Sequence, residues 1–435
     1  MNTNNSVVIL AGGFGTRMMA EFPDTPKPMI PIDGIPVLEH LINECIKYNQ
    51  YNILLVLHHM PQSIIDYFGD GSKRGINISY YIEKKPLGTG GALLAIKDLV
   101  SERFFVLYAD VYSDVNLLKF LDFHKSKKAD ISIVVHPNDH PYDSDIVISD
   151  SSNKVIKFSS HPHHDQRIDN IVNAALYIVN KKALLVNSLE NRIFDIAQDL
   201  FPNLLKNNIS IFSYNTVEFI KDMGTPKRKT AVEIAINQNI VKSRSLQSER
   251  KAIFLDRDGT INKLNGHISD PSEIKIYPLS PDAISKINKS EFLAICITNQ
   301  PVIARGECTF EKLELINNEM KNQLGAFGAY LDKIYFCPHH PDSGFDGEIK
   351  DLKIDCSCRK PKPGMIINAQ NEFNINLEKS WFIGDSEADI GAAENAGCQS
   401  VLIGKLNKNI DSFKYQPTRI EKDINSAVEY ILNLN

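Results

Sequence analysis

The sequence predicts an α/β protein with two domains, each built around a mostly parallel β-sheet. Short apolar runs alternate with helical patterns along the first half of the chain, which is typical of βαβ units. The pattern restarts near residue 250, after a polar and basic segment. The chain has 435 residues, and domains usually have about 100–200. We therefore expect domains at 1–237 and 251–435, joined by a linker at 238–250.

The expected strands are continuously apolar, as in sheets that are covered on both faces. In the first half they are 7–10, 53–57 and 104–108, and the helix after the first has an apolar face of Val37, Leu38, Leu41, Ile42, Cys45 and Ile46. In the second half the expected strands are 252–255, 293–298, 333–336 and 381–383, and the clearest helix is 310–327.

The bulk composition excludes several classes of protein. A formal net charge of −5 gives no indication of a nucleic-acid-binding surface. No apolar run reaches the ~18–20 residues of a membrane span, and the first apolar stretch reads as a strand and not as a signal peptide. Seven cysteines are an odd number for a disulfide framework. We expect a cytoplasmic protein that binds neither nucleic acid nor membrane; a homo-oligomer is left open.

A glycine-rich loop, LAGGFGTR, follows the first strand at residues 10–17. Its glycines allow the backbone to approach a phosphate closely and to point N–H groups at it. The loop is not a P-loop, because no Gly-Lys-Ser/Thr follows, nor a dinucleotide fingerprint, because Met18 stands where a third glycine would be. Taken alone, it could equally be a tight turn.

Four further segments accompany this loop: PKPMIP (26–31), EKKPLGTGGAL (83–93), the Asp110 of VLYADVYSD, and DMGTP (222–226). Over residues 6–235 the set resembles the sugar-1-phosphate nucleotidyltransferase family, whose signature is Gly-Gly-x-Gly-Thr-Arg followed by Lys-Pro. The resemblance implies a Rossmann-like three-layer domain of the GT-A-like type. It also implies a reaction that depends on positioning and electrostatics, since the triphosphate charge must be neutralised.

The resemblance assigns a role to each matching residue. The loop would cradle the triphosphate, Arg17 and Lys27 would be its catalytic cations, and Asp110 and Asp222 would hold Mg²⁺ through hard oxygen ligands. The alternatives are a surface lysine at position 27 and solvated carboxylates at 110 and 222. The implied substrate-binding residues are Gly12, Gly13, Gly15 and Thr16 for the phosphates, and Glu83 and Gly88 for the base and sugar.

Three segments depart from the family pattern. Ala109 precedes Asp110 where the family usually has Asn-Gly-Asp, and Ala175 ends a segment where it usually has Asn-Ala-Gly. Ser159 and Ser160 stand where many members have a Glu-Lys pair near the sugar phosphate. The phosphate anchor is therefore open; the candidates are His161, His163, His164 and Arg167, and a merely solvated loop is the alternative.

The second half carries four motifs in order: FLDRDGT (254–260), ITNQ (297–300), RKPKPGM (359–365) and IGDSEAD (383–389). Each lies at an expected strand end or helix start, where open α/β sheets bind ligands. Over residues 250–435 they resemble phosphatases of the haloacid dehalogenase superfamily. About forty residues separate Asp256 from Thr298, too few for a large cap domain, so we expect a capless fold of this type. We also expect a zinc loop, from the cysteine segments between the second and third motifs.

The superfamily's chemistry implies these roles. Asp256 would be the nucleophile that forms an aspartyl-phosphate, and Asp258 the general acid and base. Mg²⁺ would lie on the carboxylates of Asp256 and Asp385 and on the backbone carbonyl of Asp258. Thr298 and Lys360 match the phosphate-binding positions, and the remaining implied residues are Asn299 and Arg359 for substrate and Asp389 as a supporting carboxylate.

Between the second and third motifs, Cys337 and His339 are two apart, and so are Cys356 and Cys358. Three thiolates and an imidazole suit a closed, tetrahedral, structural Zn²⁺ site. His340 is the competing nitrogen ligand, and a disulfide is the alternative to a metal.

The cysteine segments resemble those of heptose-1,7-bisphosphate 7-phosphatases and histidinol-phosphate phosphatases. The first half is similar to heptose-1-phosphate and mannose-1-phosphate guanylyltransferases. We therefore expect a bifunctional enzyme that removes the 7-phosphate of D-glycero-D-manno-heptose 1,7-bisphosphate and then transfers a nucleotidyl group, from GTP in preference to other NTPs, to the sugar 1-phosphate. The product would serve a surface polysaccharide. The alternatives are a hexose-1-phosphate transferase fused to a histidinol-type phosphatase, and a first domain that only binds sugar nucleotide.

Overall fold

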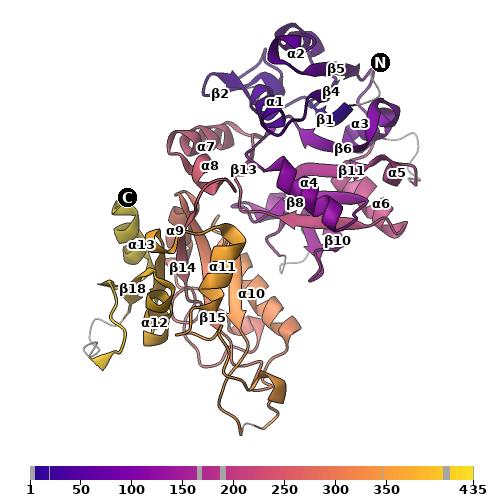
Figure 1. Ribbon diagram of the computed structural model, residues 1–435. Helices are drawn as coiled ribbons and strands as arrows, with labels where there is room; N and C mark the ends of the chain where they lie inside the picture. Colours follow the sequence, from indigo (N-terminus) through magenta and orange to yellow (C-terminus); the bar gives the residue numbers. More distant parts are fainter. Residues whose placement is uncertain are drawn as a thin grey trace. The chain divides into compact units, whose positions relative to one another are not determined.

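The computed structural model describes residues 5–18, 20–163, 169–186, 193–344, 346–404 and 412–434. The chain forms two compact units (Figure 1). The first unit comprises Met1–His136, Asp143–Pro162 and Ile171–Val241, and the second comprises Pro137–Tyr142, His163–Asn170 and Lys242–Asn435. No helix within these described ranges is long and apolar enough to cross a membrane.

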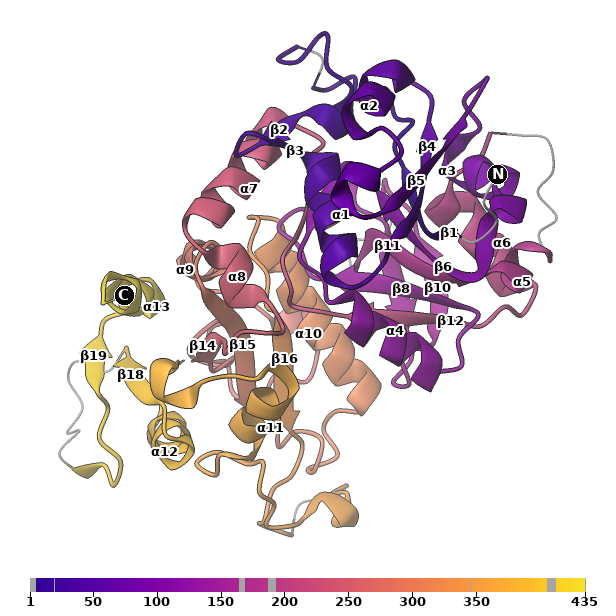
Figure 2. The ribbon, with the colours of Figure 1, turned by 45° about the horizontal axis from the view of Figure 1, so that its top comes forward.

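The first unit contains a nine-stranded sheet whose main path is β10-β9-β11-β6-β1-β4-β5 (Figure 2). β1 (Asn5–Leu10), β4 (Asn52–Leu57), β5 (Asn77–Ile82) and β6 (Val100–Tyr108) are parallel, as the alternating pattern predicts. β11 (Val172–Asn180) then pairs antiparallel with β6, with β8 (Ile131–His136) and with β9 (Ile146–Ser149). β10 (Val155–Ser159) pairs with β9, and β12 (Ile211–Asn215) with β8. The sheet is therefore mixed beyond β6, with antiparallel pairs where the first four strands are parallel.

Both faces of this sheet are buried, so the unit has three layers. Val7 and Ile9 of β1 belong to one hydrophobic cluster, together with Leu41 of α1, whereas Val8 belongs to the cluster on the other face, with Leu93 of α3. Such alternation follows from the period of two in a strand. The helices are α1 (Val37–Lys47), α2 (Pro61–Phe68), α3 (Gly88–Ala95), α4 (Leu117–Ser126), α5 (Lys181–Leu184), α6 (Phe201–Lys206) and α7 (Pro226–Asn237).

Two short ribbons complete the first unit. β2 (Pro31–Ile32) pairs with β3 (Ile35–Pro36), just after the expected Lys-Pro segment. β7 (Val111–Ser113) pairs antiparallel with β13 (Ile220–Asp222). The second ribbon joins two segments that are far apart in the sequence and that each carry an expected metal-binding aspartate.

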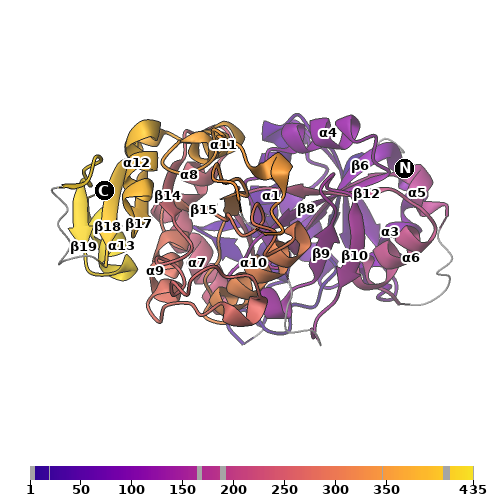
Figure 3. The ribbon, with the colours of Figure 1, turned by 90° about the horizontal axis from the view of Figure 1, so that it is seen from below.

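The second unit is built on a six-stranded sheet with the order β16-β15-β14-β17-β18-β19, in which every pair is parallel. Figure 3 shows α12 and α13 on opposite sides of β18. The strands are β14 (Lys251–Leu255), β15 (Phe292–Asn299), β16 (Lys333–Cys337), β17 (Trp381–Gly384), β18 (Gln399–Ile403) and β19 (Arg419–Glu421). The helices are α9 (Ser280–Asn288), α10 (Phe310–Gly325), α11 (Gly364–Phe373), α12 (Glu387–Ala396) and α13 (Ile424–Asn433).

The segment expected as a linker, 238–250, is helical in part. It contains α8 (Ile240–Arg244), and two buried arginines attach its end to the second unit. Arg244 forms an ion pair of 3.0 Å with Asp332, and Arg250 donates hydrogen bonds to the carbonyls of Arg244 and Phe373. Both arginines lie within the segment expected as a linker. The domain limits expected from the sequence stay a prediction.

Candidate active sites

In the second unit, three carboxylates converge at the carboxyl ends of two neighbouring strands. Asp256 follows β14 and Asp385 follows β17, and these strands are parallel neighbours. One oxygen each of Asp256, Asp385 and Asp389 lies within 4.8 Å of the others. The sequence placed these residues in one site because parallel strands present their ends at the same edge of a sheet.

Lys360 lies among these carboxylates and is almost completely buried. Its Nζ is 2.6 Å from Asp256 Oδ1 and 2.6 Å from Asp389 Oδ1, and it donates a hydrogen bond of 2.8 Å to the carbonyl of Ile297. Burial raises the pKa of Asp256 to about 7, although Lys360 acts in the opposite direction. Burial alone would lower the pKa of Lys360, but the two carboxylates raise it above its ordinary value, so the ammonium stays charged.

The carboxylate of Asp258 is held separately from this cluster. Its oxygens accept hydrogen bonds from Arg257, Asn262 and Gln300, at 2.8–3.2 Å. Burial would raise the pKa of Asp258, but the Arg257 guanidinium and these hydrogen bonds hold it below the usual value. The motif predicted the role of Asp258, whereas Arg257 and Gln300 lie within the FLDRDGT and ITNQ motifs but were assigned no role from the sequence.

Thr298 and Asn299 end β15 beside Lys360. Thr298 is buried, and its hydroxyl accepts a hydrogen bond of 2.9 Å from Gln300. The side-chain amide of Asn299 is bonded to the backbone of Lys360: its oxygen accepts from the Lys360 N–H at 3.0 Å, and its nitrogen donates to the Lys360 carbonyl at 3.2 Å. Asn299 therefore fixes the backbone that carries Lys360, a contact that the sequence did not predict.

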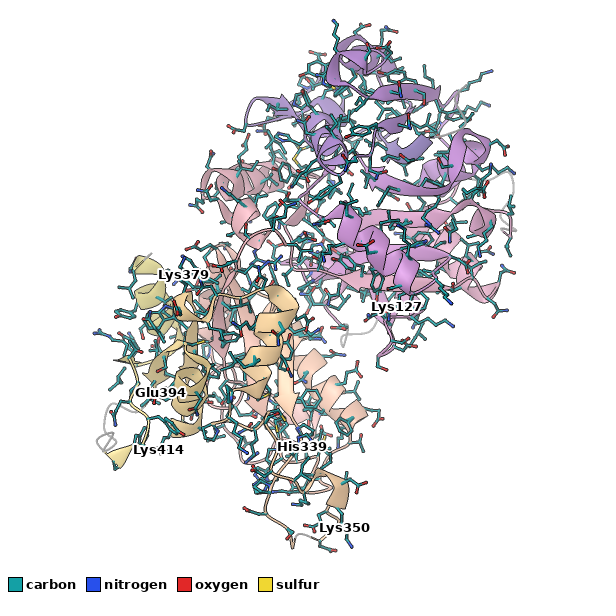
Figure 4. All side chains as sticks on the ribbon, viewed as in Figure 1. Lys127, His339, Lys350, Lys379, Glu394 and Lys414 are labelled. Carbon is teal, nitrogen blue, oxygen red and sulfur yellow. The ribbon has the colours of Figure 1, made fainter. Side chains whose placement is uncertain are left out.

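The four expected zinc ligands form one group at the end of β16. Cys337, His339, Cys356 and Cys358 each place one donor atom within 4.8 Å of the others, and His339 is labelled in Figure 4. The sulfur–sulfur distances are 3.1–3.5 Å, and all three cysteines are free. A disulfide would need about 2.05 Å, so the group has the composition and convergence of a Cys₃His metal site.

His340 is not part of this group. Its Nδ1 accepts a hydrogen bond of 3.1 Å from the Asp342 N–H. Arg359, one residue after Cys358, donates from Nη1 to the carbonyl of His339 at 3.3 Å. The cysteine loop is thereby tied to the segment that delivers Lys360 to the carboxylates. Between Asp256 and the start of β15, where every residue is described, the only helical segments are one 3-10 turn and α9, and the chain forms no cap domain there.

In the first unit, the four expected charged residues gather around the glycine loop. Lys27 Nζ is 2.5 Å from Asp110 Oδ2. The Met223 N–H donates to the Asp110 carbonyl at 2.8 Å, which brings Asp222 beside Asp110 through the β7–β13 ribbon. A Cβ on Gly224 would lie 2.8 Å from Arg17 Nη2, so the Arg17 guanidinium reaches the same ribbon.

Two glycines make this approach possible. A Cβ on Gly224 would also lie 2.9 Å from Asp222 Oδ1, too close for any other residue without a shift. Gly15 has a φ of +64°, and a Cβ there would lie 3.0 Å from the Cβ of Lys27. Asp222 has a further cationic partner that the sequence did not reveal, because Arg228 Nη1 is 2.7 Å from its Oδ1.

Glu83 lies on the other side of the glycine loop, directly after β5. Its carboxylate is 9% exposed, and Oε1 accepts a hydrogen bond of 3.1 Å from the Leu87 N–H. Oε2 lies 3.0 Å from the position that a Cβ on Gly12 would take. Burial raises the pKa of Glu83, and the Leu87 amide and His58 act in the opposite direction. Gly88 has a φ of +74°, and a Cβ there would collide with the Phe194 carbonyl at 2.4 Å.

The departures from the family pattern have different structural consequences. Ala109 is buried. Ala175 has a φ of +55°, a left-handed conformation that favours glycine, and its N–H donates to Asn173 Oδ1. Among the candidate anchors, His161 lies 3.4 Å from Asp145 Oδ1, whereas His164 and Arg167 lie outside the described residues.

Comparisons with known proteins match each half of the chain to a family. The family model of nucleotidyl transferases matches residues 6–238, and that of HAD-like hydrolases matches residues 357–427. The chain therefore belongs to the nucleotidyl transferase family over its first unit and to the HAD-like hydrolases over its second. It is an enzyme with two activities, a nucleotidyltransferase and a phosphatase.

Individual relatives match one half each. The second half is 38% identical over 159 residues to D-glycero-beta-D-manno-heptose-1,7-bisphosphate 7-phosphatase of Yersinia pestis, covering 37% of this chain and 82% of the relative. The first half is 30% identical over 248 residues to mannose-1-phosphate guanylyltransferase of Mycobacterium tuberculosis, covering 56% and 67%. Among solved structures, HddC from Yersinia pseudotuberculosis complexed with GMP-PN is 27% identical with a TM-score of 0.45, covering 52% of this chain and 96% of HddC.

Proposed function

We propose that this enzyme makes a nucleotide-activated heptose in two consecutive steps. The phosphatase removes the 7-phosphate of D-glycero-D-manno-heptose 1,7-bisphosphate, and the transferase joins a guanylyl group from GTP to the remaining 1-phosphate, with release of pyrophosphate. The observation that carries the proposal is the similarity of the second half to heptose-bisphosphate phosphatases, in a chain whose first half belongs to the nucleotidyl transferase family and is similar to a mannose-1-phosphate guanylyltransferase. The product of one reaction is then the substrate of the other.

In the phosphatase, Asp256 is the nucleophile. One of its carboxylate oxygens attacks phosphorus while the bond to the sugar oxygen breaks. Asp258, whose pKa lies below the usual value in the free protein, must take up a proton as the anionic phosphate binds beside it, and it gives this proton to the leaving sugar oxygen. Asp258 then takes a proton from a water molecule whose oxygen attacks the phosphorus. The bond to Asp256 breaks, inorganic phosphate leaves, and both carboxyl groups return to their first state. Lys360 and Thr298 bind the phosphate oxygens.

The residues present fit the metals that this chemistry uses. Asp256 and Asp385 offer hard oxygen ligands that converge, and Mg²⁺ bound there would offset the mutual repulsion of the phosphate and the nucleophile. The Cys₃His group fits a structural Zn²⁺, since four soft donors converge and leave no open position. Such an ion would order the cysteine loop and, through it, the segment with Arg359 and Lys360.

In the transferase, Arg17 and Lys27 neutralise the triphosphate and hold it for attack by the sugar phosphate. Asp110 and Asp222 are the carboxylates that would hold Mg²⁺ on the phosphates. Because Lys27 and Arg228 occupy these carboxylates in the free protein, nucleotide binding must exchange partners. The cations then turn to phosphate oxygens, and the carboxylates become available as metal ligands.

Glu83 supports GTP as the nucleotide. The Watson–Crick edge of guanine presents two adjacent N–H donors, which one carboxylate can accept together. Uracil and thymine present a single N–H between two carbonyl oxygens, and these oxygens would be repelled by a buried carboxylate. Binding to two donors also favours the ionised form of Glu83 against the effect of its burial.

A substrate screen tests the proposal. The purified enzyme with Mg²⁺ is offered sugar bisphosphates, and phosphate release is measured; the products, and mannose 1-phosphate in parallel, are then incubated with GTP, CTP, UTP or dTTP while pyrophosphate is measured. We expect the heptose bisphosphate and GTP to be preferred, and Glu83→Gln to lower kcat/KM for GTP by about 10–100-fold, since a good bidentate contact contributes about 1–3 kcal/mol of discrimination. Preference for mannose 1-phosphate would favour a hexose-1-phosphate transferase. If no pair of sugar phosphate and NTP released pyrophosphate, the transferase step would be contradicted.

A further inference from the structure

Arg257 lies beneath Asp258 and has no exposed surface. Its Nε is 3.1 and 3.2 Å from the two carboxylate oxygens of Asp258, and its Nη2 is 2.9 Å from Oδ2. Its Nη1 donates to Asn317 Oδ1 on α10 at 3.2 Å. The guanidinium therefore holds the Asp258 carboxylate from below and is itself attached to a long helix of the phosphatase.

Complete burial restricts what Arg257 can do. Its three nitrogens are bonded to Asp258 and Asn317, so we place Arg257 behind the carboxylate and not against substrate, unlike Lys360, which lies among the converging carboxylates. A buried guanidinium also has a large desolvation cost, which a well-packed apolar side chain at the same place would avoid. The contact that offsets this cost is the one with Asp258, so any effect of Arg257 on the reaction passes through that carboxylate.

Gln300 supports the same carboxylate from another strand. It is 2% exposed, and its Nε2 donates both to Asp258 Oδ2 at 2.8 Å and to Thr298 Oγ1 at 2.9 Å. Asn262 donates to Asp258 Oδ1 at 2.9 Å. Each carboxylate oxygen is therefore held by Arg257 and by one amide, and one of these amides also bonds the hydroxyl expected to bind phosphate.

We propose that Arg257 is a positioning residue which, together with Gln300, sets the place from which Asp258 exchanges protons with the leaving group and with water. The inference rests on the proposed role of Asp258. A general acid contributes about 10²–10⁴-fold to a rate, and a misplacement of about 1 Å can cost about 10²-fold. Loss of Arg257 should therefore matter most when departure of the leaving group needs a proton.

The test compares two leaving groups in the full-length enzyme with Mg²⁺. Phenyl phosphate and p-nitrophenyl phosphate are used as probes, because phenol needs protonation on departure far more than nitrophenol and neither depends on the identity of the natural sugar. We expect Arg257→Met to lower kcat/KM for phenyl phosphate about 100-fold and that for p-nitrophenyl phosphate by about tenfold or less. The ratio of kcat/KM for phenyl phosphate to that for p-nitrophenyl phosphate should therefore fall about tenfold or more. Arg257→Lys keeps the positive charge but not the planar guanidinium that bonds both carboxylate oxygens, and it should restore part of this ratio. Gln300→Leu should lower the ratio, as Arg257→Met does, but by less.

Two further variants separate the possible failures. Arg250→Met removes another buried arginine of the same unit, whose hydrogen bonds go to backbone carbonyls; it should lower the melting temperature without changing the ratio. Asp258→Asn should change the ratio most. If Asp258→Asn leaves the ratio unchanged, the role proposed for Asp258 is wrong. If it changes the ratio but Arg257→Met and Gln300→Leu lower both substrates equally, the positioning role alone is overturned.

Discussion

The two active sites solve the same problem, holding phosphate beside carboxylates, with opposite arrangements of charge. In the phosphatase, one buried lysine is shared by Asp256 and Asp389, whose side chains are 11% and 0% exposed. In the transferase, the two carboxylates have different cations: Asp110 pairs with Lys27, and Asp222 pairs with Arg228, which also binds Asp143; the side chains of Asp110 and Asp222 are 34% and 31% exposed. The first arrangement is set by the core before substrate arrives, whereas the second can exchange partners at low cost when nucleotide binds.

This difference has an electrostatic reason. Charges that are taken out of water must be compensated within the fold, so a buried ion pair cannot lose one member without a large penalty. Partly exposed pairs are screened by water, and pairs at the surface contribute about 0–1 kcal/mol. A transferase that must accept a triphosphate and a metal in the same place benefits from pairs that part easily. A phosphatase that transfers a phosphoryl group to its own aspartate benefits from a site whose charges are already in place.

The largest expected effect tests whether the two sites are chemically independent. Asp256→Asn removes the nucleophile and should lower phosphate release about 10⁴-fold or more, while pyrophosphate release by the transferase should be unchanged. Asp110→Asn is the matched variant, with the opposite result. Loss of both activities in Asp256→Asn would show that the sites do not act separately.

Loss of the metal loop should have the next largest effect, and it should be confined to the phosphatase. Metal analysis should find about one tightly bound zinc per chain, absent in the Cys356→Ser, Cys358→Ser double variant. That variant should also lose phosphatase activity, because the loop holds the segment with Lys360, but should retain nucleotidyl transfer. A zinc-free chain that is folded and fully active as a phosphatase would contradict the structural role of the ion.

The contrast in burial can be measured as stability. Lys360→Met leaves Asp256 and Asp389 without their cation, and breaking a buried pair costs about 3–5 kcal/mol. Lys27→Met breaks the partly exposed pair with Asp110 and should cost about 1 kcal/mol, less than the loss of the buried pair. Urea unfolding of both variants at pH 7 would give the two free energies; equal costs would remove the distinction drawn between the sites.

The smallest expected effect concerns the strained backbone of the transferase. Ala175 has a positive φ, and the left-handed conformation costs a residue with a side chain about 1–2 kcal/mol. Glycine, however, loses more conformational freedom on folding than alanine, which costs about 0.5–1 kcal/mol and offsets part of the gain. Ala175→Gly should therefore stabilise the transferase by about 0.5–1 kcal/mol in urea unfolding. A destabilised Ala175→Gly variant would show that packing of the methyl group outweighs the strain.

Much of each site could be predicted because its residues follow local patterns. Asp256, Thr298 and Asp385 come at the ends of continuously apolar runs, and parallel strands bring such ends together. The four zinc ligands share a spacing that suits a metal. By contrast, the antiparallel pairing of β11 with β6, β8 and β9 could not be predicted, because an apolar run marks a strand but not the direction of its neighbours.

The sequence by itself predicted which residues carry the chemistry and at which strand ends they lie, because periodicity and motif spacing are properties of neighbouring positions. Only the tertiary structure decided which polar groups are paired: Lys360 with Asp256, 104 positions away, Gln300 with Asp258, and Lys27 with Asp110. Side chains choose such partners from everything that folding brings within reach, and burial sets the strength of each choice. The same residue types thus become a rigid site in one unit and an exchangeable one in the other.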